Sequence, residues 1–362
     1  MLSPVWVIGA SAAYLLLLFA VASFADWRLA QGRSLIANPW TYALSLAVYC
    51  TAWTYFGSIG RAASGGIWFL PIYLGPTLAM LLGWMVVRKM IRIAKTYRIT
   101  SIADFVGSRY GKSPWLAGLA TLIALVGIIP YIALQLKAVS SGYALLTATA
   151  EPGDLVHWSR DSTFYMALAL AGFTMVFGAR HLDTTERHEG MVAAIAFESV
   201  VKLVAFLVVG LFVVYGLFDG LDDLFARVQK VPKLAGLLRL DHGGQFAWSQ
   251  WFALTVLSML SVIFLPRQFH VMVVENVAES HLRRAVWVFP LYLLVINLLV
   301  LPIALGGLLY FGPTPMNPDN FVLSLPLVAG QPALALLAFI GGLSASTGMV
   351  IVETIAVSTM VC

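Results

Sequence analysis

Four ionisable residues lie inside long apolar stretches of the sequence, where a charge is expensive and usually marks a function. Glu198 and Lys202 lie four residues apart on one helix face, so they could hold two helices together as a neutral pair or serve ion coupling. Lys137 ends an apolar run and either extends to the membrane surface or reaches an inner cavity. For Glu353, we expect ordinary solvation near the cytoplasmic end of its helix, with proton relay as the alternative.

Hydroxyl side chains accompany helix-weakening residues in two further apolar stretches, Ala47–Gly60 and Ser258–Pro266. Broken helices of this kind free backbone carbonyls for a cation and helix ends for a substrate, whereas small residues also permit tight helix packing. A third stretch, Gly341–Gly348, is dense in small residues and carries the hydroxyls of Ser344 and Thr347. Na⁺ prefers such oxygen ligands, so two interpretations stay open here, a cation site and close helix packing.

The composition indicates which elements must position these residues. Of the 362 residues, 60% are hydrophobic and 11% are charged, and the mean hydropathy is +0.88. Soluble domains are about 45–50% apolar and about 25% charged, so lipid must surround much of this chain. The net charge of +5 does not indicate nucleic acid, because the basic residues flank apolar segments instead of forming a polar face. The two cysteines, Cys50 and Cys362, predict no disulfide framework.

The sequence contains no motif of a soluble enzyme. It has no phosphate-binding glycine loop and no pair of Cys or His at metal-ligand spacing, so we predict no catalytic residue and no organic cofactor in this chain. We place four histidines in cytoplasmic loops, namely His181, His188, His270 and His281.

A membrane-spanning helix needs about 20 apolar residues, and the chain has several such stretches. We predict about nine spans, near residues 4–24, 40–57, 68–87, 115–146, 162–178, 190–218, 250–265, 286–311 and 332–361. The loops after the first, third, fifth and seventh spans hold 14 Lys and Arg and the alternate loops hold six, which predicts an N-terminus outside the membrane. We expect a short surface helix around Asp219–Phe225 and an irregular loop over 312–331.

Four stretches together resemble the sodium/solute symporter family, and the resemblance covers essentially the whole chain. They are Phe56–Gly66, Thr100–Gly111, Phe177–Gly190, and Pro266–His270 followed by Ser280–Arg284. The resemblance implies an all-α integral membrane protein with a leucine-transporter-like bundle, which is a five-plus-five inverted-repeat core preceded by an extra helix in residues 1–30. Because the last span runs directly into Cys362, we expect residues 1–362 to form one such domain that is incomplete at its C-terminal side.

The same resemblance implies a sodium site between the first and eighth core helices. Its ligands would be carbonyl and hydroxyl oxygens of Ala47, Cys50, Gly341, Ser344 and Thr347. The family usually has a second hydroxyl next to Ser344, where this chain has Ala345, and either Ser346 or Thr347 could replace it. The solute would bind at mid-membrane along Trp53, Thr54, Gln135, Ser258 and Ser261.

Two stretches, Asp183–Gly190 and Leu265–Asn276, are more similar to sensor histidine kinases that carry a symporter-like N-terminal domain. This likeness implies sodium-coupled transport of a small organic solute such as an amino acid, sensing of that solute, or both, in a bacterial inner membrane. A kinase region and its response regulator would then lie beyond this chain. The expected partners are the solute, Na⁺ and membrane lipid, and the alternative is a receptor or anchor domain that does not transport.

Overall fold

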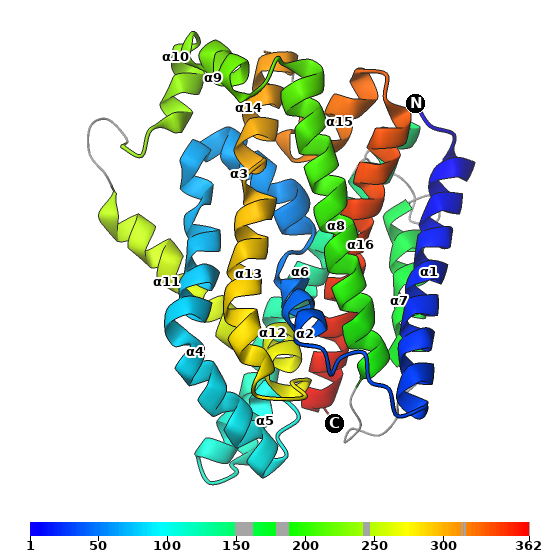
Figure 1. Ribbon diagram of the computed structural model, residues 1–362, viewed down its shortest axis with the longest axis vertical. Coiled ribbons are helices and arrows are strands. Elements are labelled where there is room, and N and C mark those ends of the chain that lie inside the picture. The colour runs from blue at the N-terminus through cyan, green and yellow to red at the C-terminus, as the bar shows by residue number, and fades with distance from the viewer. Residues whose placement is uncertain (149–161, 179–187, 242–246, 313, 315, 362) are drawn as a thin grey trace.

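The computed structural model describes residues 1–148, 162–178, 188–241, 247–312, 314 and 316–361, and the regular elements in these ranges are helices (Figure 1). The long helices are α1 (Pro4–Ala30), α4 (Pro71–Tyr97), α6 (Pro114–Thr147), α8 (Glu189–Phe212), α13 (His281–Asn297) and α16 (Pro332–Val361). The shorter ones are α2 (Pro39–Ser45), η1 (Leu46–Tyr49), η2 (Trp53–Gly57), α3 (Ser58–Gly65), η3 (Gly66–Phe69), α5 (Ile102–Arg109), α7 (Ser162–Gly178), η5 (Val213–Leu217), α9 (Leu221–Gln229), α10 (Pro232–Ala235), η6 (Gly236–Leu238), α11 (Trp248–Phe264), α12 (Pro266–Phe269), η7 (His270–Val274), α14 (Val300–Phe311), η8 (Pro318–Asn320) and α15 (Phe321–Val328).

Six helical stretches of the described chain are long and apolar enough to cross a membrane. They are α1, α4, α6, α8 with η5, α13 with α14, and α16, and the bent pair of α11 with α12–η7 makes a seventh. The other two predicted spans are α7, which is 17 residues long, and the interrupted segment that runs from α2 to α3. Each of the nine predicted spans therefore has a helical counterpart, and the chain is a multi-pass membrane protein.

The first interruption lies between α2 and α3. The tight 3₁₀ turn η1 ends at Tyr49, and Cys50 then takes an extended backbone conformation with φ −80° and ψ 97°. Helical structure resumes as the wide π-turn η2 and continues into α3. A regular α-helix satisfies its backbone internally, so this break leaves peptide groups in the membrane interior that need partners elsewhere.

The second interruption lies between α11 and α12, at Leu265. Pro266 has no backbone N–H and disfavours helical geometry in the residue before it, and Leu265 accordingly adopts ψ 128°. The two halves of this broken span meet at an angle of 55°. Because the helix continues beyond the break, His270 lies buried in η7, and its predicted place in a cytoplasmic loop is wrong.

One loop prediction is confirmed and another is wrong. The helix expected around Asp219–Phe225 is α9. The 312–331 segment, expected to be irregular, contains η8 and the buried helix α15. The apolar run Phe321–Leu325 explains the difference, because burial of its side chains against the bundle outweighs the weak helical tendency of a proline-containing segment.

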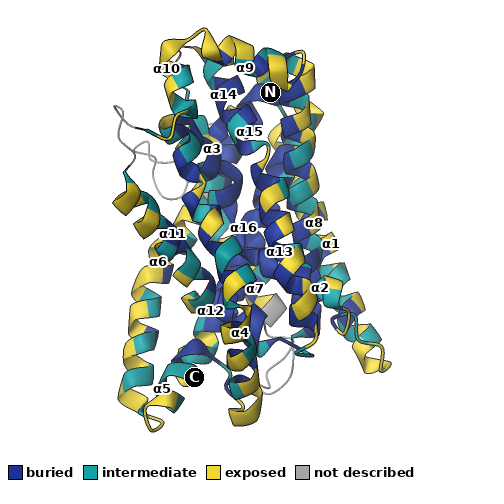
Figure 2. Cartoon of the chain, turned by 60° about the vertical axis from the view of Figure 1, so that its left-hand side comes forward, coloured by how far each residue is buried: buried dark blue, intermediate teal, exposed yellow. Residues whose placement is uncertain are grey.

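Helices α8 and α16 form the centre of the bundle (Figure 1). Helix α1 packs on α8, α6 on α16, α11 on α4, and α13 on α2. Buried residues make up 83% of the most apolar stretch of α16 but only 6% of that of α6, whose exposed surface is visible in Figure 2. The N-terminus and the end of α16 lie at opposite ends of the bundle, as an odd number of crossings requires. Which side of the membrane each end faces stays a prediction.

Candidate functional site

A buried lysine binds the carbonyls that the first helix break exposes. Lys202 lies on α8 and is 3% exposed, and its Nζ donates hydrogen bonds to the carbonyl oxygens of Ala47 and Cys50, both at 2.8 Å. Ala47 belongs to η1 and Cys50 follows its end, so the ladder of a regular α-helix is interrupted at this point. Buried carbonyls need polar partners, and the ammonium of Lys202 supplies one to both.

Glu198, one helical turn before Lys202, binds α16 instead. The Thr347 hydroxyl donates to Glu198 Oε1 at 2.6 Å, and the Ser344 hydroxyl donates to the backbone carbonyl of Glu198 at 3.0 Å. Gly348 leaves space for the carboxylate, because a Cβ there would collide with Glu198 Oε2. The acidic residue of α8 is thus fixed to α16, and the basic residue to η1.

The direct pair that the spacing of Glu198 and Lys202 suggested does not form. Among the described residues, neither has an ion-pair partner within 4.0 Å, although they share one helix. Their side chains diverge toward two different neighbours of α8. The two residues therefore link three elements, which are η1, α8 and α16, instead of neutralising each other.

The predicted sodium ligands gather around these α8 charges. The carbonyls of Ala47 and Cys50 accept from Lys202, and the hydroxyls of Ser344 and Thr347 donate to Glu198. Gly341 allows α16 to approach η2, because a Cβ there would collide with the hydroxyl of Tyr55. Ser346 is also buried, but its hydroxyl bonds the Gly342 carbonyl of its own helix. Binding of Na⁺ by this set stays a prediction.

An open groove of about 770 Å³ lies between α6 and α11, beside the first helix break. Four of the five residues predicted to follow the solute pathway line it, namely Trp53, Thr54, Ser258 and Ser261. Most of its surface is apolar, and the hydroxyls of Thr54, Ser258 and Ser261 are its small polar groups. The groove and the Lys202 contacts thus meet on one discontinuous span.

Gln135, the fifth residue of the predicted pathway, does not line this groove. It is fully buried on α6, where its Oε1 accepts from the backbone N–H of Ala52 at 2.9 Å and its Nε2 donates to the carbonyl of Tyr131 at 3.4 Å. The amide therefore satisfies a backbone group that the helix break leaves without a helical partner. Its position indicates support of the break.

A second pair of buried charges lies beside the groove. Arg267, which follows the second helix break, donates from Nη1 to Glu353 Oε2 on α16 at 2.7 Å. Its guanidinium also lies over the ring of Tyr131, 4.9 Å from the ring centre. Glu353 is completely buried, so the expected ordinary solvation is wrong. Arg267 lies just beyond the predicted span 250–265, so the sequence gave no sign of the partner that keeps Glu353 away from water.

Lys137 faces a separate cavity of about 410 Å³ above the groove. Arg61, Asp319 and Trp53 also line it, and the Lys137 side chain is exposed. Both alternatives for Lys137, extension to the membrane surface and contact with an inner cavity, therefore stay open. Trp53 borders both cavities and therefore lies between them.

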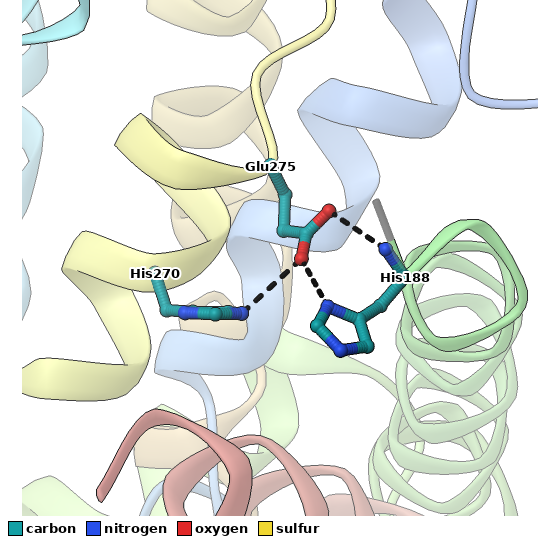
Figure 3. A group of neighbouring side chains, drawn as sticks. All are labelled: His188, His270 and Glu275. Carbon is teal, nitrogen blue, oxygen red and sulfur yellow. Dashed lines mark hydrogen bonds and ion pairs between the residues drawn. The ribbon is translucent and has the colours of Figure 1, made fainter. Parts of the chain in front are cut away.

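Sequence spacing missed a largely buried cluster at the start of α8 (Figure 3). The Glu275 carboxylate lies 2.8 Å from His188 Nδ1 and 3.2 Å from His270 Nε2, and it also accepts from the His188 backbone N–H. Burial raises the pKa of Glu275, but the bonds from His188 and His270 outweigh it and lower the pKa to about 2. Their ligand atoms lie within 4.8 Å of one another, so the three could hold a transition metal. His188 lies more than 80 residues before the other two, so no local motif announces the cluster.

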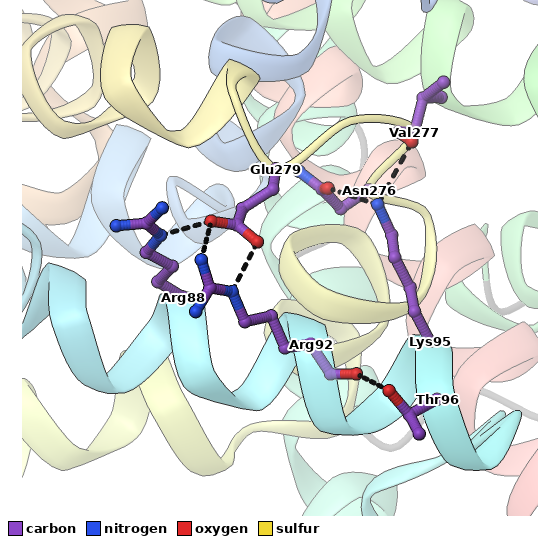
Figure 4. A network of polar contacts seen from close by, with 7 residues as sticks. All are labelled: Arg88, Arg92, Lys95, Thr96, Asn276, Val277 and Glu279. Atoms are coloured by element: carbon purple, nitrogen blue, oxygen red, sulfur yellow. Dashed lines mark hydrogen bonds and ion pairs between the residues drawn. The ribbon is translucent and has the colours of Figure 1, made fainter.

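The basic end of α4 holds the turn between η7 and α13 (Figure 4). Arg92 binds both carboxylate oxygens of Glu279 at 2.7 and 2.9 Å, and Arg88 binds the same carboxylate. Lys95 donates to the Asn276 side chain at 3.1 Å. These basic residues were counted above only for membrane orientation, and they also fix the segment that carries the His188–Glu275 contact.

The chain is similar to two curated proteins of Bacillus subtilis (strain 168), and no protein-family model matches it. It is 26% identical to the uncharacterized symporter YhjB over 304 residues, which are 78% of this chain and 57% of the relative. It is 32% identical to the uncharacterized symporter YodF over 90 residues, which are 25% of this chain and 18% of the relative. The chain thus spans little more than half the length of YhjB.

A solved structure is similar over almost the whole chain. It shows a Na⁺-coupled sialic acid symporter in a substrate-bound outward-open state, with a TM-score of 0.70 and 12% sequence identity. The match covers 98% of this chain and 72% of that protein. At this identity the likeness establishes the fold, and it confirms the all-α, leucine-transporter-like membrane bundle expected from the sequence.

Proposed function

We propose that this chain is the membrane-embedded part of an ion-coupled symporter that moves a small organic solute across a bacterial inner membrane. One observation carries the proposal: a single discontinuous span contributes Trp53 and Thr54 to an open groove and the Ala47 and Cys50 carbonyls to a bound ammonium. Solute and cation can therefore act on the same element. Movement of that element would couple the two, because each ligand shifts the population of the state that it binds better.

The groove suits a solute with an apolar body and few polar groups. Its wall is mainly apolar, with the hydroxyls of Thr54 and Ser261 and the guanidinium of Arg267 at its edge. An amino acid fits this description, since it combines a charged backbone with a side chain that can contact apolar walls. The similar proteins are named as symporters, which supports symport as the activity.

Na⁺ is the coupling ion predicted from the sequence and the one used by the structurally similar sialic acid symporter. The oxygens of Ala47, Cys50 and Ser344 are of the kind that Na⁺ prefers. The Lys202 ammonium already holds two of them, so Na⁺ would have to displace it in order to bind there. The choice of ion therefore depends on Lys202.

A sensing role linked to a histidine kinase and a response regulator is supported by the two sequence stretches 183–190 and 265–276 alone. The similar proteins are named as symporters, and for this reason we place transport first. A receptor or anchor domain would bind the solute without moving it. Uptake measurements separate these functions.

The test is uptake of a ¹⁴C-labelled amino-acid mixture into proteoliposomes that contain the full-length protein. Ser261→Leu places bulk in the groove and should lower the uptake rate at least about ten-fold, whereas Leu16→Ala, on the exposed face of α1, should leave it unchanged. Saturable binding of the mixture without accumulation would favour the receptor. Uptake that Ser261→Leu does not change would contradict the proposed groove.

A further inference from the structure

The Lys202 ammonium binds backbone carbonyl oxygens in the way that a free metal cation would. A buried ammonium is usually neutralised by a carboxylate, yet Lys202 Nζ points at two carbonyl oxygens, of Ala47 and Cys50, at 2.8 Å each. These carbonyls belong to the broken segment, and oxygens of such segments are the groups that coordinate a transported cation in membrane proteins. The Lys202 ammonium, which is part of the chain, therefore lies where a free cation could bind the same two carbonyls.

The hydroxyls that would complete a sodium site are directed elsewhere. The Ser344 hydroxyl donates a hydrogen bond to the backbone carbonyl of Glu198, and the Thr347 hydroxyl donates one to its carboxylate. Thr347 also donates toward carbonyls of its own helix. The oxygens expected to bind Na⁺ therefore have three different partners: the Lys202 ammonium, the backbone carbonyl of Glu198 and the Glu198 carboxylate.

The electrostatic surroundings of Lys202 come from several elements. Glu198 on its own helix and the Cys50 thiol next to η1 favour its charge, and Arg267 of α12 opposes it. Tyr14 of α1 lies beside Glu198, on the α16 side of the cluster. Whether Lys202 carries a charge therefore depends on groups from its own helix, from the broken segment and from α12.

We propose that Lys202 is the built-in cation of this site and that the exchangeable ion is a proton carried by Lys202 instead of Na⁺. This inference rests on the proposed symport function. When the N–H bond breaks, the proton leaves as H⁺ through water and the electron pair stays on the amine. The neutral amine can donate only uncharged hydrogen bonds, which are about half as strong, so it holds the carbonyls of Ala47 and Cys50 less firmly and loosens the broken segment from α8. Uptake of H⁺ from the other side restores the ammonium and the contact.

Binding of ²²Na⁺ to the purified full-length protein tests the inference without any transport. We compare wild type, Lys202→Ala and the control Lys137→Ala, whose lysine lies in a separate cavity. At pH 6, Lys202→Ala should bind one more Na⁺ per chain than wild type, because the carbonyls are vacant only in the variant. At pH 9.5 the difference should vanish, since loss of the proton empties the site in wild type as well. Lys137→Ala should match wild type at both values.

Each other outcome overturns the inference. Equal Na⁺ stoichiometry for wild type and Lys202→Ala at pH 6 would mean that Lys202 does not exclude Na⁺. A difference that persists at pH 9.5 would mean a permanent clamp without an exchangeable proton. Lys202→Gln provides a second variant if gel filtration shows that Lys202→Ala is not folded. Failure of the uptake assay would count against symport alone, because Na⁺ binding is measured independently of it.

Discussion

Two sets of buried ionisable residues lie in this bundle, and they differ in whether their members bind each other. Glu198 and Lys202 are four residues apart on one helix, yet each binds a different neighbour, α16 and the broken segment after α2. Arg267 and Glu353 are 86 residues apart, yet they form a direct ion pair at 2.7 Å. Both sets are almost completely enclosed.

This difference shows that the partner of a buried ionisable side chain depends on which polar groups lie near it in space, and not on its distance in sequence. Lys202 bonds two carbonyls that the break after η1 exposes, and Glu198 accepts from the Thr347 hydroxyl. The two side chains therefore point to different neighbours and do not pair. The break at Leu265 instead delivers Arg267 directly to Glu353. We infer that the directly paired set holds α12 to α16, whereas Glu198 and Lys202 join α8 to two different neighbours.

The largest effect should come from removing one member of the direct pair. Glu353→Leu leaves the Arg267 guanidinium buried without its carboxylate, and breaking a buried pair in this way destabilises by about 3–5 kcal/mol. The measurement is the free energy of unfolding in detergent, followed by tryptophan fluorescence. Arg267→Met combined with Glu353→Leu removes both charges and should recover most of the loss. A double variant no more stable than Glu353→Leu would show that the pair is not what holds α12 to α16.

A smaller loss of unfolding free energy is expected when a bond of Glu198 is removed. Thr347→Val removes the hydroxyl that donates to Glu198 at 2.6 Å, and a buried acceptor left without its partner costs about 1–3 kcal/mol. Ser346→Ala is the matched control, because Ser346 is equally buried on α16 but bonds only the carbonyl of its own helix. The same unfolding measurement applies. Equal losses for the two variants would contradict a bond between α8 and α16 at Glu198.

The sequence predicted the bundle well because its signals are local. Apolar length located the spans, and Pro266 marked the second break directly. The resemblance also brought the predicted oxygens of Ala47 and Ser344 to one cluster. These features depend on neighbours in the chain or on a shared fold, and both can be recognised without a structure.

The wrong predictions concern side chains whose partners are remote. Glu353 was expected near water because it lies toward the cytoplasmic end of its span, and no local pattern joins it to Arg267, 86 positions away. The His188–Glu275 contact was missed for the same reason. For Lys202, spacing suggested Glu198, but the exposed carbonyls exist only once the helix is broken. Tertiary structure, and not propensity, decides such contacts.

The third prediction concerns the close packing of Gly348 against Glu198. Gly348→Ala places a methyl group where the Glu198 carboxylate lies, and overpacking of a core typically destabilises by about 1–3 kcal/mol. We expect the lower part of this range, because the displaced atom ends a flexible side chain. Gly83→Ala is the control, since nothing lies within 4 Å of its added carbon on α4, and it should stabilise by about 0.5–1 kcal/mol. Opposite signs for the two variants confirm the prediction, and destabilisation by both contradicts it.

The smallest effect should come from an ion cluster in contact with water, which contrasts with Arg267–Glu353. Bonds from Arg92 and Arg88 lower the pKa of Glu279 to about 2, from a usual value of 4.5. The stabilisation is therefore present above about pH 4.5 and is lost as the pH falls toward 2. Because water and salt screen exposed charges, Glu279→Gln should lower the melting temperature slightly at pH 7 and less in 1 M salt. The Glu353→Leu loss should not depend on salt, and a salt-independent loss of similar size for Glu279→Gln would remove the distinction between enclosed and exposed pairs.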